Sequence, residues 1–130
     1  MSLFDECIEV LGENAHVLSD SQREQILNNF EDSFPFTHWG RIDWDKVSNH
    51  TEVNTVEDIN SFLNQNVDYS NIIYVIWDEV TLPIIQSNLE KVFEFIDDVT
   101  AVSFDTWLFS PSSGYVIEIF HDGEVRIGLK

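Results

Sequence analysis

Near the C-terminus, four residues that could ligate a metal or transfer a proton fall within seven positions. They are Glu118, His121, Asp122 and Glu124, in the stretch "GYVIEIFHDGEVRIGL". Carboxylates and imidazoles bind divalent metals and serve as acid–base catalysts. A hairpin turn also accounts for them, because a three-residue loop His121-Asp122-Gly123 places glycine where a left-handed conformation is favoured. We predict the hairpin and leave open a loose ion site at His121.

Cross-strand pairing distinguishes this loop from a two-residue Asp-Gly loop. The three-residue loop pairs Phe120 with Glu124, and it then pairs apolar residues with apolar residues: Ile119 with Val125, Ile117 with Ile127, and Tyr115 with Leu129. On the other face it sets Glu118 opposite Arg126, a favourable charge pair. The two-residue loop would set both charged residues opposite isoleucines. The longer loop is therefore predicted.

Patterns typical of enzymes are absent from the sequence. It has no Gly-rich phosphate loop, no Gly-x-Ser-x-Gly, no His-Glu-x-x-His and no Cys-x-x-Cys. Cys7 lies on the apolar stripe of an expected helix, which favours a buried, inert thiol over a nucleophile. Carboxylates are so numerous that no pair stands out as an acid–base dyad. We expect a protein without catalytic residues, metal or cofactor.

Acidity is the most informative global property, with 24 acidic residues against 6 basic ones and a formal net charge of −18. Such a field repels nucleic acid and attracts cationic partners. Solubility or a halophilic source is the alternative explanation, although 13% aromatic residues fits a halophilic chain poorly. We expect a basic partner and no direct binding of nucleic acid.

Two segments combine aromatic and acidic residues in the way that protein interfaces do. The stretch "HWGRIDWDK" contains Trp39, Asp43, Trp44 and Asp45, and "WDE" places Asp78 and Glu79 at the end of an expected strand. Tryptophan is a frequent interface anchor, and a carboxylate beside it can meet a partner's lysine or arginine. These six residues are the candidate partner-binding site. The alternative is that the tryptophans belong to the core.

The elements that must position these residues follow from periodicity and capping signals. Three helices are expected at 3–11, 20–33 and 56–63, capped by Ser2, Ser19 or Asp20, and Thr55. A buried strand at 71–77 is followed by a helix that starts at Thr81 to Pro83 and continues to Ile96. A strand at 103–109 and the hairpin complete the order.

This order predicts an α+β protein of one domain, residues 1–130, with a mixed four-stranded sheet that ends in a C-terminal antiparallel meander. The N-terminal helices and one crossover helix would pack on the sheet. In the meander we expect Phe109 opposite Tyr115 and Trp107 opposite Ile117. One sheet face would carry Phe104, Leu108, Val116 and Phe120, either covered by the N-terminal helices, which we expect, or open as an interaction surface.

Several absences in the sequence bear on where the protein works. No apolar run reaches the roughly 18 residues of a membrane span, and no basic leader opens the chain. A lone Cys7 excludes an internal disulfide and fits a reducing compartment. We expect a cytoplasmic protein that does not contact a membrane.

The segment from Tyr74 to Leu129, above all "AVSFDTWLFSP" and "GYVIEIFHDGE", resembles immunity proteins of bacterial contact-dependent growth inhibition systems. The resemblance implies a cytoplasmic bacterial protein that binds, 1:1, the basic C-terminal toxin domain of a large secreted protein. Such toxins are commonly nucleases, and inhibition would be stoichiometric occlusion. An acidic mimic of nucleic acid that blocks a DNA- or RNA-binding protein remains the alternative.

Overall fold

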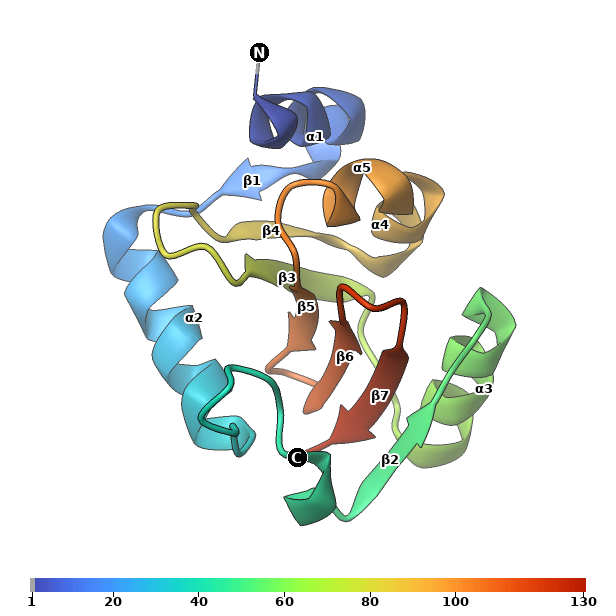
Figure 1. Ribbon diagram of the computed structural model, residues 1–130. Helices are drawn as coiled ribbons and strands as arrows, with labels where there is room; N and C mark the ends of the chain where they lie inside the picture. Colours follow the sequence, from blue (N-terminus) through green and yellow to red (C-terminus); the bar gives the residue numbers. More distant parts are fainter. Residues whose placement is uncertain (1) are drawn as a thin grey trace.

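The computed structural model describes residues 2–130 as a seven-stranded antiparallel sheet with helices on both faces (Figure 1). The helices are α1 (Leu3–Leu11), α2 (Asp20–Ser33), α3 (Val56–Asn66), α4 (Leu89–Glu94) and α5 (Ile96–Thr100), with short 3-10 helices η1 (Gly12–Asn14) and η2 (Trp44–Lys46). The strands are β1 (His16–Val17), β2 (Asn49–Glu52), β3 (Ile72–Trp77), β4 (Ile85–Asn88), β5 (Thr106–Ser110), β6 (Tyr115–Ile119) and β7 (Val125–Leu129). Their spatial order is β1-β4-β3-β5-β6-β7-β2.

The α+β class and the three N-terminal helices are confirmed. Each of these helices begins at a capping box, in which the side chains of Ser2, Ser19 and Thr55 accept the backbone N–H of the third helical residue. Helix α2 ends at Ser33, before the Phe34–Pro35 step that disfavours helical backbone.

The sheet is wider than the expected four strands, and it is not mixed. Every neighbouring pair of strands is antiparallel, from the β1–β4 edge to the β7–β2 edge. The two edge strands lack an apolar pattern because most of their side chains face solvent. That is why alternation in the sequence did not reveal them.

The helix expected from Thr81 or Pro83 begins only at Leu89, and the residues before it form β4. The apolar spacing of Ile85, Leu89 and Val92 suits a helix, but the Asn88 side chain caps α4 by accepting the N–H of Lys91 at 2.9 Å. Strand β4 pairs with β3 as a hairpin, so α4 and α5 connect β4 to β5 across β3. The crossover is present, but it does not join neighbouring parallel strands.

The β5–β6 pairing is shifted by one residue from the expected register. Tyr115 lies opposite Ser110 and not Phe109, because the turn holds four residues and is closed by Gly114 N–H donating to the Ser110 carbonyl at 2.8 Å. Gly114 adopts φ +75°, which glycine permits. As a result Trp107 lies opposite Glu118 instead of Ile117.

The C-terminal hairpin has the predicted register, including Ile117 opposite Ile127 and Glu118 opposite Arg126. Phe120 N–H donates to the Glu124 carbonyl at 2.9 Å, and Gly123 takes φ +96°. Its four chemically suggestive residues do not converge. The imidazole of His121 contacts Asp105, whereas Glu118 is buried inside the protein.

Both sheet faces are covered, each by its own apolar core. One core packs α1, α3, α4 and α5 against side chains such as Leu108 and Ile117. The other packs α2 and residues 34–47 against Trp107, Phe109 and Val116. Coverage by an N-terminal helix is thus confirmed for α2, while Leu108 faces the first core because of the shifted register. Phe104 lies outside both cores and is exposed.

Cys7 is fully buried on α1, as its position on the apolar stripe predicts. Burial, helped by the negative charge of Asp98, raises the pKa of its thiol to about 11. The thiol therefore stays protonated and unreactive near neutral pH.

Replacing Gly123 by valine is expected to lower the free energy of unfolding by about 1 kcal/mol or more, because a β-branched residue resists positive φ. A Cβ at this position meets no atom within 4 Å, so the cost comes from the backbone alone. Urea unfolding measures it, with Gly123→Asn as the control that tolerates positive φ better. Equal stability of the valine variant and the parent would contradict the turn.

Candidate partner-binding surface

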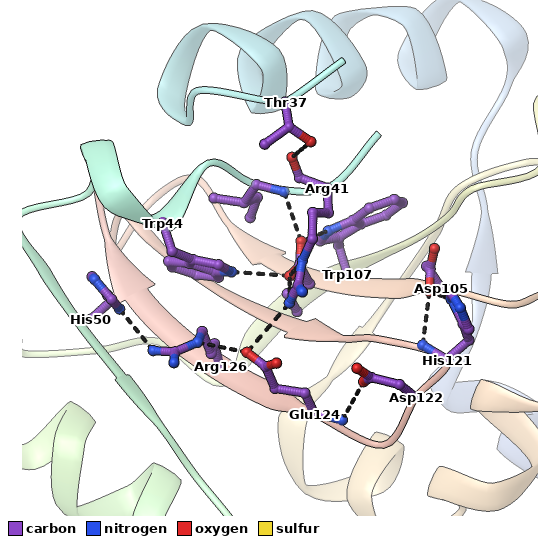
Figure 2. Close-up of polar contacts among 12 residues, drawn as sticks. Thr37, Arg41, Trp44, His50, Asp105, Trp107, His121, Asp122, Glu124 and Arg126 are labelled. Atoms are coloured by element: carbon purple, nitrogen blue, oxygen red, sulfur yellow. Dashed lines mark hydrogen bonds and ion pairs between the residues drawn. The ribbon is translucent and has the colours of Figure 1, made fainter. Parts of the chain in front are cut away.

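The carboxylate of Glu118 on β6 is completely buried and accepts five hydrogen bonds. Its Oε1 accepts from Arg41 Nη2 at 2.8 Å, Arg41 Nε at 3.0 Å and Trp44 Nε1 at 3.0 Å. Its Oε2 accepts from the backbone N–H of Ile42 at 2.8 Å and from Trp107 Nε1 at 3.0 Å. In Figure 2 the indoles of Trp44 and Trp107 and the guanidinium of Arg41 point toward one another. A buried charge is tolerated only when paired and hydrogen-bonded in this way.

Arg41 is held from two directions. Its guanidinium carbon lies 4.1 Å from the centroid of the Phe120 ring, a cation–π contact, while Glu118 binds its edge. Partial burial opposes the charge, but the hydrogen bond and the charge of Glu118 outweigh it and raise the pKa of Arg41. Glu124 bridges Arg41 at 3.4 Å to Arg126 at 2.7 Å, which extends the network toward the β2 edge.

Close packing fixes the Trp44 ring over the sheet. A Cβ on Gly128 of β7 would lie 2.6 Å from that ring, so only glycine permits the approach. The ring also lies beside that of His50 on β2, with ring centroids 5.3 Å apart. The indole is thereby aligned to donate to Glu118.

The Glu118 carboxylate also positions a short hairpin, residues 36–42, which we call the Trp39 hairpin. Phe36 and Ile42 form a β-bridge at its base, and the Arg41 carbonyl accepts from both the N–H and the hydroxyl of Thr37. Because Arg41 and Ile42 are both bound to Glu118, the base is fixed to the sheet. Trp39 at the tip is 79% exposed.

Three apolar side chains are far more exposed than the other large apolar residues that the structure describes. They are Trp39 at 79%, Val80 at 81% and Phe104 at 78%. All three adjoin Asp78 through the hollows that surround it. Exposed apolar groups rimmed by charge mark interaction sites. We define the Asp78 surface by its six residues: Trp39, Asp78, Glu79, Val80, Phe104 and Asp105.

Asp78 lines two hollows of this surface. The larger is a groove of about 460 Å³ between α2, the Trp39 hairpin and the ends of β3 and β5, with Phe30, Phe36 and Trp107 at its apolar base. Trp39, Val80, Asp105 and Glu31 border it as well. The smaller, of about 360 Å³, brings in Glu79 and Phe104.

Internal hydrogen bonds fix the two central carboxylates. Asp78 Oδ1 accepts from Ser103 Oγ at 2.6 Å and from Asp105 N–H at 3.1 Å. Asp105 Oδ1 accepts from His121 N–H at 2.9 Å and lies 2.9 Å from the imidazole. Within residues 2–130 the Oδ2 of either residue forms no hydrogen bond with another residue. The Oδ2 atoms of Asp78 and Asp105 therefore remain available as acceptors, although the Asp105 side chain is only 13% exposed.

The structure brings together three of the six sequence-predicted residues, Trp39, Asp78 and Glu79. Trp44 is buried at 7% exposure, as the alternative interpretation of the tryptophans allowed. Asp43 is partly buried and lies 3.7 Å from Lys46, while Asp45 is exposed on η2. Neither aspartate lines the two hollows.

Sequence reasoning missed Val80, Phe104 and Asp105 as site residues. Phe104 and Asp105 fell within an expected strand, yet β5 starts at Thr106 and leaves both on the preceding loop. Val80 lies in the β3–β4 loop, where Arg23 of α2 donates to its carbonyl at 3.2 Å and to that of Leu82 at 3.0 Å. A hairpin prediction for β3–β4 would have placed Val80 in the connecting loop and not at the start of a helix.

Exposed apolar side chains among fixed carboxylates, on an α+β frame, are typical of a surface that contacts another protein. A family model described as CdiI immunity protein EcoliA0-like matches residues 1–128. The chain belongs to this family of immunity proteins, which confirms the resemblance seen in its C-terminal half and indicates a role in neutralising a toxin.

No protein in the curated collection matches the chain. None of the helices in residues 2–130 has the length and apolarity needed to cross a bilayer.

Replacing Glu118 by glutamine is expected to lower the free energy of unfolding by about 3 kcal/mol, because Arg41 loses its buried counter-charge and an amide N–H₂ then faces other donors. Glu124→Gln is the matched control, since its side chain is 28% exposed and should cost under about 1 kcal/mol. Urea unfolding gives both values. Equal losses of stability in the two variants would show that the buried Glu118 carboxylate stabilises the fold no more than the partly exposed Glu124 does.

Proposed function

We propose that this immunity protein neutralises a basic toxin domain by binding it 1:1 through the Asp78 surface. The observation that carries the proposal is the coincidence, on one surface, of the three most exposed large apolar side chains with fixed carboxylates. Aromatic anchors supply binding energy at protein interfaces, and charged neighbours supply orientation and specificity.

The charge of the whole molecule favours a cationic partner. A net charge of −18 steers a basic domain toward the protein and raises the association rate at low ionic strength. The carboxylates would stand where phosphates bind if the toxin is a nuclease. Inhibition is then occlusion of the toxin surface in the cytoplasm, without chemistry by the immunity protein.

Co-purification tests the proposal directly. A tagged chain drawn from lysate of its source organism at ~0.5 M salt should retain one basic fragment in a 1:1 ratio, since a tight interface does not depend on screened charge alone. Loss of every partner at that salt, or competition by any polyanion, would favour the acidic mimic of nucleic acid instead.

Reversing Asp78 and Glu79 to lysine should weaken the complex at least ~30-fold, the effect of losing an interface hot spot. Asp43→Lys with Asp45→Lys is the matched control, because it changes the net charge equally and lies outside both hollows. Calorimetry with the purified toxin domain measures both affinities. Equal weakening would mean that only the overall charge matters, or that the η2 aspartates belong to the interface too.

A further inference from the structure

The six basic residues of the chain are distributed unevenly with respect to its acids. Arg41 and Arg126 pair with Glu118 and Glu124, Lys46 pairs with Asp43, and Lys91 pairs with Glu94. In the part of the chain that the structure describes, none of the basic residues forms an ion pair with Asp78, Glu79 or Glu31, and Asp105 contacts only a histidine. The acids of the groove, Glu31, Asp78 and Asp105, thus have no lysine or arginine as an ion-pair partner among the described residues, and the groove keeps a negative charge even with Arg23 in its lining.

Arg23 also lines the groove, and its positive charge offsets part of the charge of Glu31, Asp78 and Asp105, but it forms no ion pair with any of them. Its Nε and Nη2 donate to the carbonyls of Leu82 and Val80, so its hydrogen bonds hold the β3–β4 loop against α2. The carboxylates of Asp78 and Asp105 keep Oδ2 acceptors that no described residue uses. The groove therefore combines acceptors fixed in place with an apolar, aromatic base.

The protein already contains one site of this composition. Arg41 lies with its guanidinium over the Phe120 ring at 4.1 Å while the Glu118 carboxylate binds its edge at 2.8 Å. A planar guanidinium suits this pair of contacts, because its face stacks on an aromatic ring while its N–H groups bind a carboxylate. An ammonium group lacks that planar face.

We infer that the groove beneath Trp39 binds an arginine side chain of the partner, with the guanidinium stacked on the exposed indole and hydrogen-bonded to Oδ2 of Asp78 and Asp105. This inference rests on the proposed function and names the chemistry that the Asp78 surface recognises. The carboxylates are held by Ser103, the Asp105 backbone and His121, so they lose little freedom on binding.

Three short peptides test the inference on the intact protein. Acetyl-Gly-Gly-Arg-Gly-Gly-amide is compared with its lysine twin and with its citrulline twin, which keeps the shape of arginine but has no charge. The readout is the set of four indole N–H resonances. Those of Trp44, Trp77 and Trp107 are buried and bonded internally, whereas Trp39 is exposed, so the protein supplies its own controls.

The arginine peptide should shift the Trp39 resonance saturably, with a Kd on the order of 1 mM, and leave the other three unmoved. The lysine peptide should bind at least ~3-fold more weakly and the citrulline peptide at least ~10-fold more weakly. Equal binding of arginine and lysine, or shifts spread over the acidic surface, would overturn the inference.

A double variant locates the site. Asp78→Asn with Asp105→Asn keeps the Oδ1 acceptors and turns each Oδ2 into a donor, so arginine binding should fall at least ~10-fold. Glu9→Gln with Glu57→Gln makes the same change of charge on exposed helical residues away from the groove and should change binding less than ~2-fold. Unfolding midpoints of both variants verify that they are folded. An equal loss in both would overturn the inference.

The toxin domain separates failure of this inference from failure of the proposed function. If the toxin binds tightly, and loses affinity with Asp78→Lys and Glu79→Lys, while the peptides show no preference for arginine, the arginine site is wrong and the proposed function stands. If the arginine peptide binds at Trp39 but those reversals leave the toxin complex unchanged, the groove recognises arginine, but the toxin does not bind there and the proposed surface is wrong.

Discussion

The Glu118 carboxylate is the constraint on which the arrangement of this protein depends. It lies on β6, fully buried among the side chains of the sheet face that α2 covers, where an unpaired charge would be strongly destabilising. Its five donors come from β5 and from Arg41 to Trp44, so the same bonds that satisfy the charge attach a long irregular segment to the sheet. The Trp39 hairpin extends from that attachment and has a defined position, although its only regular pairing is the Phe36–Ile42 bridge.

Because the chain has only six lysine and arginine residues, some of its acidic regions contain ion pairs and others do not. Around Glu118 and Glu124, arginines neutralise the acids and stabilise the fold. Around Asp78 the acids are oriented by neutral donors and a histidine, and their charge is left to the exterior. The first region supplies rigidity and the second supplies attraction, which is the combination expected of a tight binder with a fast association rate.

The features of the fold that were predicted correctly from the sequence are those determined by residues close together in the chain. Helix caps at Ser2, Ser19 and Thr55 and the C-terminal hairpin depend on residues a few positions apart. The antiparallel β3–β4 pairing and the one-residue shift at Ser110 were missed, because they are decided by turn geometry and by tertiary packing. That shift places Trp107 opposite Glu118. The expected pairing of Trp107 with Ile117 therefore could not predict the hydrogen bonds to the Glu118 carboxylate. Phe104 was likewise assigned to a sheet face because its strand starts later than its pattern indicates.

Hydrogen–deuterium exchange on the complex with the toxin domain tests the central claim most directly, because it locates the contact without altering either protein. The account predicts slower exchange confined to the Trp39 hairpin and to the loops at 78–82 and 101–105, with α1 and α3 unchanged. Protection on α1, on α3 or along the β2 edge, with these three segments exchanging as in the free protein, would contradict it.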